Sequence, residues 1–130
     1  MWKPPTVDDV AQDAAALLHE DDEALARRTI YRFIEHYDNA SWDERSEMVA
    51  HQPRPTGNQR LDALLAGCVE FSCAIHGLAA PGWVNAPQYF LDQFWFVAGV
   101  RALEADAMAN SPISFARRAI FLNRHSLTYA

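Results

Sequence analysis

The chain is poor in cysteine and has no long apolar run, and each shortage excludes a class of protein. Its two cysteines, Cys68 and Cys73, lie inside a helical pattern, so the sequence predicts reduced, buried thiols and no disulfide framework. The longest apolar run, Phe94 to Val100, is too short to span a membrane. The first residues, Met-Trp-Lys-Pro-Pro, contain no apolar segment of the signal-peptide type. We therefore expect a cytoplasmic protein with no membrane partner.

Basic residues are also scarce relative to acidic ones. Seventeen Asp and Glu residues against eleven Lys and Arg residues give a formal net charge of -6. Such a charge repels phosphate backbones and anionic lipid surfaces, so no direct binding of nucleic acid is expected. Half of the residues are apolar and 22% are charged, which is typical of a globular protein. The length of 130 residues predicts a single domain that covers residues 1–130.

The sequence contains none of the motifs that usually carry catalysis or bind a metal. The five histidines are scattered, without His-x-x-x-His or His-Glu-x-x-His, and no P-loop, Gly-x-Ser-x-Gly or Gly-x-Gly-x-x-Gly is present. Cys73 and His76 share a helix face, but Cys68 does not, and a zinc site needs its ligands to converge. The sequence therefore predicts no catalytic residue, no metal and no cofactor.

Helical spacing of apolar residues runs through most of the chain and predicts an all-α fold, a compact bundle of about five to seven helices with a short extended C-terminal segment. Thr6 is expected to cap the first helix, and Ser41 with Glu44 has the spacing of a capping box. Ser111 and Pro112 repeat such a start signal. The expected helices cover about 7–18, 23–37, 42–50, 58–76, 87–99, 100–109 and 112–118, and residues 119–122 are expected to be extended. Val100, Leu103 and Ala107 are expected to point inward.

The strongest periodicity lies between Leu61 and Ile75, which places this helix at the centre of the core, with Gly77 as its C-terminal cap. The segment Trp83 to Val100 holds many of the large aromatic residues. As a helix from near Pro87 it is apolar almost all the way round, so it must be covered on every side. Its part from 94 to 97 is also compatible with an extended conformation. Tyr89 and Phe96 flank the only polar stripe, and they either fill the core or line a partner surface.

Three stretches carry a family resemblance: Thr56 to Gly67, Pro87 to Phe96, and Ser111 to Arg118 with the Ile-Phe-Leu that ends at Leu122. Together they resemble the C-terminal, non-DNA-binding domain of actinobacterial helix-turn-helix regulators of the xenobiotic-response-element type, some of which look like antitoxin partners of nucleotidyltransferase-like toxins. The resemblance covers about residues 21–130. Residues 1–20 are expected to form an additional helix, and they are too few for the helix-turn-helix module.

The resemblance implies a partner-binding role, with five contact residues: Trp83, Tyr89, Phe96, Arg117 and Arg118. The leading hypothesis is a non-enzymatic protein-interaction domain, the antitoxin-like or regulatory partner of a neighbouring gene product. A second hypothesis is a small-ligand or enzymatic pocket beneath Trp83 and Trp95, with Asp92 or His76 as its polar group. A third is a homodimer formed through the aromatic residues.

Overall fold

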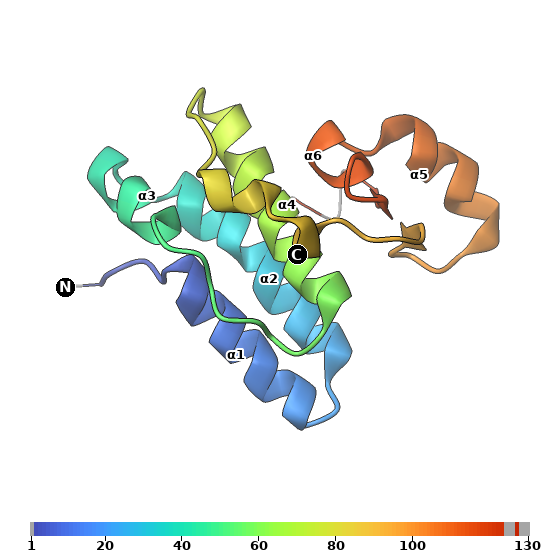
Figure 1. The fold of residues 1–130 in the computed structure, drawn as a ribbon, viewed down its shortest axis with the longest axis horizontal. Helices are drawn as coiled ribbons and strands as arrows, with labels where there is room; N and C mark the ends of the chain where they lie inside the picture. The colour runs from blue at the N-terminus through green and yellow to red at the C-terminus, as the bar shows by residue number, and fades with distance from the viewer. Residues whose placement is uncertain (1, 124–126, 128–130) are drawn as a thin grey trace.

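The computed structural model describes residues 2–123 and 127, and within them it confirms the mostly α-helical fold. The N-terminal part contains four helices: α1 (Val7–His19), α2 (Glu23–Asp38), α3 (Trp42–Val49) and α4 (Gln59–Ile75). The remainder, residues 81–123, is less regular, and we call it the C-terminal lobe. It contains the 3-10 helices η1 (Gly82–Asn85), η2 (Pro87–Tyr89) and η3 (Arg101–Leu103), the short helices α5 (Glu104–Asn110) and α6 (Ile113–Ala116), and the strands β1 (Trp95–Phe96) and β2 (Ile120–Phe121). Figure 1 shows this lobe beside α4.

The four long helices start where the sequence signals predicted. Thr6 and Asp9 form a capping box at α1, and Ser41 and Glu44 form one at α3. Asn58 caps α4 by accepting a hydrogen bond from the backbone N–H of Leu61. These caps satisfy N–H groups that have no partner inside the helix, which fixes each start by short-range contacts alone.

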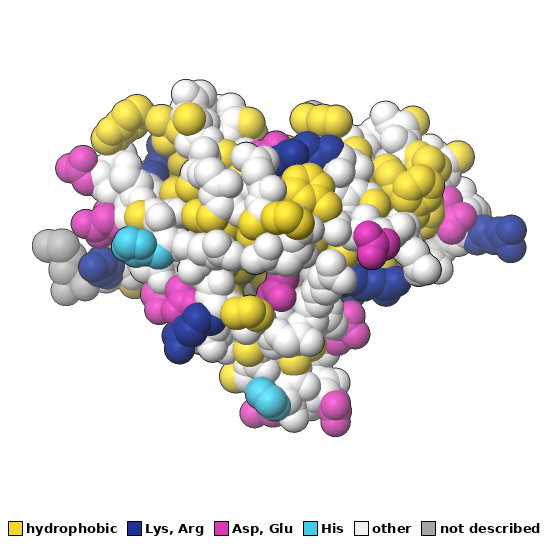
Figure 2. Space-filling view, viewed as in Figure 1, with side chains coloured by type: hydrophobic (Ala, Val, Ile, Leu, Met, Phe, Trp, Pro, Cys, Tyr) yellow, Lys and Arg dark blue, Asp and Glu magenta, His cyan; other side chains and the backbone are white. Residues whose placement is uncertain are grey.

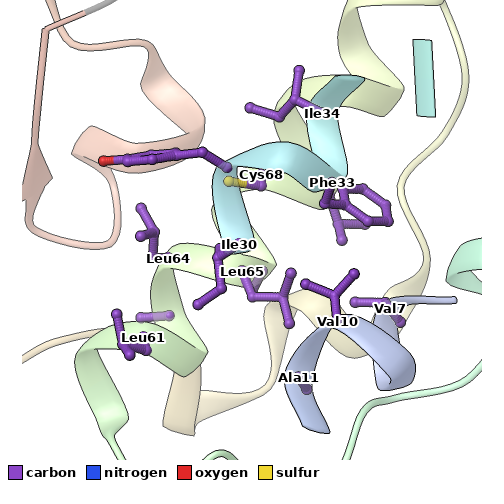
Figure 3. Close-up of a cluster of buried hydrophobic side chains, with 14 of the residues drawn as sticks. Val7, Val10, Ala11, Ile30, Phe33, Ile34, Leu61, Leu64, Leu65 and Cys68 are labelled. Carbon is purple, nitrogen blue, oxygen red and sulfur yellow. The ribbon is translucent and has the colours of Figure 1, made fainter. Parts of the chain in front are cut away.

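The core is formed by α1, α2 and α4, whose apolar side chains converge in Figure 3. In α4, every residue from Ala63 to Val69 is buried. One side of α4 packs on α1 and α2, and another contacts η1, η2 and α6. At Gly67 the ring of Phe115 comes so close that an added Cβ atom would lie 2.7 Å from it. Helix α4 is therefore the element that the rest of the chain surrounds, as its periodicity predicted.

The segment from Trp83 to Val100 is different, and its predicted helix from Pro87 is wrong. After two 3-10 turns the backbone becomes extended, and Trp95–Phe96 pairs in parallel with Ile120–Phe121. The backbone N–H of Trp95 donates to the carbonyl of Ala119 at 2.8 Å, and that of Val97 donates to the carbonyl of Phe121 at 3.0 Å. Aromatic and β-branched residues pack well on extended backbone, so the alternative of an extended 94–97 segment is confirmed at Trp95–Phe96.

The segment that joins the two strands also departs from the prediction. The helix expected at 100–109 is divided into η3 and α5, and Val100 and Leu103, expected to point inward, are half exposed. Ser111 ends α5 and does not cap α6, because its hydroxyl accepts a hydrogen bond from the backbone N–H of Leu122 at 2.9 Å. Helix α6 starts at Ile113, with Pro112 as its cap.

Candidate interaction site

The two arginines predicted as contact residues meet at one carboxylate, that of Glu70 on α4. Arg118 is completely buried, with 0% of its surface exposed. Its Nη2 donates to Glu70 Oε1 at 2.6 Å, its Nη1 donates to the carbonyls of Val84 and Tyr89 at 2.8 and 3.4 Å, and its Nε donates to the carbonyl of Ser114 at 3.0 Å. A single guanidinium thus ties α4, η1, η2 and α6 together.

The electrostatics of this centre explain why a charged group can be buried there. Burial lowers the pKa of Arg118, and the nearby Glu70 carboxylate opposes that effect. Arginine nevertheless stays protonated in proteins, so the pair remains ionic. Each of the three guanidinium nitrogens has at least one acceptor, which offsets part of the loss of hydration. Arg118 is therefore part of the interior and cannot contact a partner of the folded chain.

Arg117 contacts the same Glu70 from the surface. Its Nη2 lies 2.6 Å from Glu70 Oε1 and 2.7 Å from Asn85 Oδ1, and 32% of its side chain is exposed. The guanidinium carbons of Arg117 and Arg118 lie 4.9 and 4.8 Å from the centre of the Phe90 ring. Both cations therefore lie near one aromatic ring, which adds cation–π attraction to the ion pairs.

Two further predicted residues, Trp83 and Tyr89, pack against each other. Their rings meet edge to face with centres 5.6 Å apart, and the indole N–H of Trp83 donates to the carbonyl of Val49 at 2.9 Å. Only 4% of Tyr89 is exposed, so it fills the core, the other option that the sequence left open. Trp83 is half-buried. Of the five predicted contact residues, Trp83, Phe96 and Arg117 thus keep exposed surface, and their partner-binding role stays a prediction.

Phe96 belongs to an exposed group of apolar side chains on the C-terminal lobe. Phe94, Phe96 and Phe121 contact one another, with ring centres 5.2 to 6.5 Å apart. Phe96 and Phe121 also line a small hollow, and its further apolar lining comes from Ala98, Val100, Leu103, Ala107 and Leu122. We call the set Phe94, Phe96, Val100, Leu103 and Ala107 the apolar face. In Figure 2, yellow side chains gather over the part of the molecule where Figure 1 places α5.

The exposure of this face is large for apolar residues. Phe94 is 61% exposed, and Val100 and Leu103 are each 50% exposed. Sequence reasoning found only Phe96, because the other residues follow a helical spacing that indicates core. The extended alternative for 94–97 carries the signal, because residues two apart on extended backbone lie on the same side, and the rings of Phe94 and Phe96 are in contact.

Other chemistry finds little support among the described residues. Within residues 2–123 and 127, no group of three or more His, Cys, Asp or Glu side chains could hold a metal ion. Cys68 and Cys73 are free and buried, as predicted, and burial raises the pKa of both thiols. A thiol with a raised pKa is a poor nucleophile at neutral pH.

The predicted pocket beneath Trp83 and Trp95 would need His76 or Asp92 as its polar group. The Nε2 atom of His76 lies 2.7 Å from Asp38 Oδ1 at the end of α2, and Asp92 is exposed. Among the described residues, no hydrogen bond, ion pair or ring contact joins either group to the two tryptophans. The face of Trp95 is instead occupied by the guanidinium of Arg60, 5.4 Å from the ring centre.

Comparisons with known proteins give no match, whether with protein-family models, with curated proteins or with solved structures. The resemblance to regulator domains therefore stays a prediction. In the part of the chain that the structure describes, no helix combines the length and apolarity needed to cross a bilayer.

Proposed function

We propose that this chain is a non-enzymatic protein-interaction domain that binds a protein partner through the apolar face. The observation that supports this most is the exposure of Val100 and Leu103 in the lining of the hollow, and of Phe94, whose ring contacts Phe96 and Phe121 in that lining. Burying apolar surface lowers the free energy by about 25 cal/mol per Å², so a contiguous exposed group of this kind is typical of an interface. Single exposed apolar residues would need no such explanation.

The partner we propose is the product of a neighbouring gene, with this chain as its antitoxin-like or regulatory half. This step is supported by the family resemblance and by the lack of catalytic motifs. Trp83 and Arg117 contribute to the same interaction only if the partner extends beyond the apolar face towards Glu70.

The test is co-expression with the neighbouring gene and purification through a tag on one chain. We expect the pair to co-purify, and the double variant Val100→Asp, Leu103→Asp to lose the partner while keeping its helical circular dichroism. A matched control is Ile75→Asp, because Ile75 is also an exposed apolar residue but lies at the end of α4. Loss of the partner in the control alone, or in neither variant, would contradict the assignment of the surface.

A further inference from the structure

The hollow in the apolar face has acidic residues at its rim. Glu104 and Asp106, at the start of α5, line it together with Phe96, Val100 and Leu103. No Lys or Arg of the described chain lines the hollow or forms an ion pair with either carboxylate. The carboxylate of Asp106 accepts one hydrogen bond, from the side chain of Asn110 at 2.9 Å. Among the residues that the structure describes, the charged groups of the rim are therefore both negative.

The size of the hollow limits what can enter it. Its volume is about 40 Å³, room for the end of one apolar side chain but not for a drug-sized ligand. An anchor residue that enters such a hollow, surrounded by flatter apolar contacts, is the usual centre of a protein interface. A partner that buries its anchor there brings its flanking residues next to Glu104 and Asp106.

We propose that the occupant is a segment of a different protein that inserts one apolar side chain into the hollow and places Lys or Arg side chains against Glu104 and Asp106. This inference rests on the proposed function and names the chemistry of its partner. Positive side chains would gain attraction from the two carboxylates and from the charge of -6 on the whole chain.

A second copy of this chain fits the face less well. In a two-fold symmetric dimer the same patch meets itself, so the Glu104 and Asp106 carboxylates of one copy would approach those of the other. Like charges brought together at an interface are unfavourable, and both copies carry the same net charge. Charge complementarity therefore favours a basic partner over self-association.

Two synthetic amphipathic peptides test the inference. Both have the same leucine face, and the polar positions are lysine in one and glutamate in the other. Fluorescence anisotropy at low salt should show the Leu/Lys peptide binding roughly tenfold more tightly than the Leu/Glu peptide, since each exposed charge pair contributes up to about fivefold. The ratio should shrink at high salt.

Variants show whether the rim sets this preference. The double variant Glu104→Lys, Asp106→Lys should reverse the preference between the two peptides. Asp13→Lys, Glu20→Lys changes the net charge by the same amount at two exposed positions of α1 and its end, so it should keep the preference. If both double variants weaken Leu/Lys binding equally, only the net charge matters and the inference is wrong.

The remaining outcomes separate this inference from the proposed function. Equal binding of both peptides by the wild-type chain, abolished by Leu103→Asp, would overturn the charge preference but support the apolar face as a binding surface. Binding of neither peptide, or binding that Leu103→Asp leaves unchanged, would overturn the inference, while the co-purification test would still decide the proposed function. A dimer in light scattering that Leu103→Asp dissociates would overturn it too, because a second copy would then occupy the face.

Discussion

Helix α4 and the C-terminal lobe differ in how much of their surface is buried and in where their hydrogen bonds go. Helix α4 buries every residue from Ala63 to Val69 and makes its backbone hydrogen bonds within itself. The lobe has strands of only two residues and a helix, α5, in which no residue is buried. Hydrogen bonds from Arg118 to the carbonyls of Val84, Tyr89 and Ser114 hold the parts of the lobe together, and its bond to Glu70 joins the lobe to α4. Helix α4 thus supplies much of the buried core, and the lobe carries the apolar face that we propose as the interaction surface.

Hydrogen exchange tests this contrast most directly. Amides near Leu64 in α4 should exchange only through global unfolding, at an opening free energy of about 5 to 15 kcal/mol. Amides near Ala107 in α5 should exchange through local opening, with an opening free energy close to zero, because none of the residues of that helix is buried. Native-state exchange followed by NMR measures both values. Equal protection of the two helices would show that the chain unfolds as one cooperative unit.

Replacing Arg118 should destabilise the lobe strongly, because its guanidinium is the buried donor that joins the lobe to α4. Arg118→Met leaves three carbonyl groups without that donor and should lower the free energy of unfolding by about 3 to 5 kcal/mol. The matched control is Arg117→Met, since Arg117 contacts the same Glu70 from a half-exposed position and should lose only about 1 kcal/mol. Urea denaturation measures both variants, and losses of equal size would refute a special role for the buried guanidinium.

The contact between α4 and α6 should tolerate no added methyl group. Gly67→Ala would place a Cβ atom 2.7 Å from the Phe115 ring and should destabilise the protein by about 1 to 3 kcal/mol through overpacking. Gly82→Ala is the control, because nothing lies within 4 Å of a Cβ atom there, and its effect should stay within about 0.5 kcal/mol. Thermal unfolding of the two variants compares them. A Gly67→Ala protein as stable as the wild type would mean that the ring can move aside.

The same contrast explains which parts of the fold the sequence predicts. Thr6 with Asp9 and Ser41 with Glu44 act over three residues, so the starts of α1 and α3 can be read from the local sequence. The pattern from Leu61 onward is equally local. The pairing of strand β1 is not local, because Trp95 pairs with Ile120 and no pattern within 83–100 contains that partner. Tertiary pairing there overrides the helical spacing.

Prediction from sequence meets the same limit at the candidate site. Its buried charge and its exposed apolar side chains both depend on contacts that no local pattern contains. Arg118 was expected at the surface, and its burial depends on Glu70, 48 positions earlier in the chain. Phe94 and Leu103 were expected in the core, and their exposure follows from the strand and the 3-10 turn that replace the expected helices. Phe96 was selected because it flanks the polar stripe of the helix expected from Pro87, and the structure has strand β1 at that position, so its role as a contact residue stays a prediction.

The smallest effects should come from one pair of serine substitutions, which compares the two regions at the level of a single hydroxyl. The Ser72 hydroxyl in α4 is buried and has no hydrogen-bond partner among the described residues, whereas the Ser111 hydroxyl in the lobe joins Ala107 to Leu122. Ser72→Ala removes an unsatisfied polar group and should raise the free energy of unfolding by up to about 1 kcal/mol. Ser111→Ala should lower it by about 1 kcal/mol, since it leaves the Leu122 N–H without its partner. Urea denaturation distinguishes the two signs, and a loss in Ser72→Ala would show that its hydroxyl is hydrogen-bonded in solution, by a buried water for example.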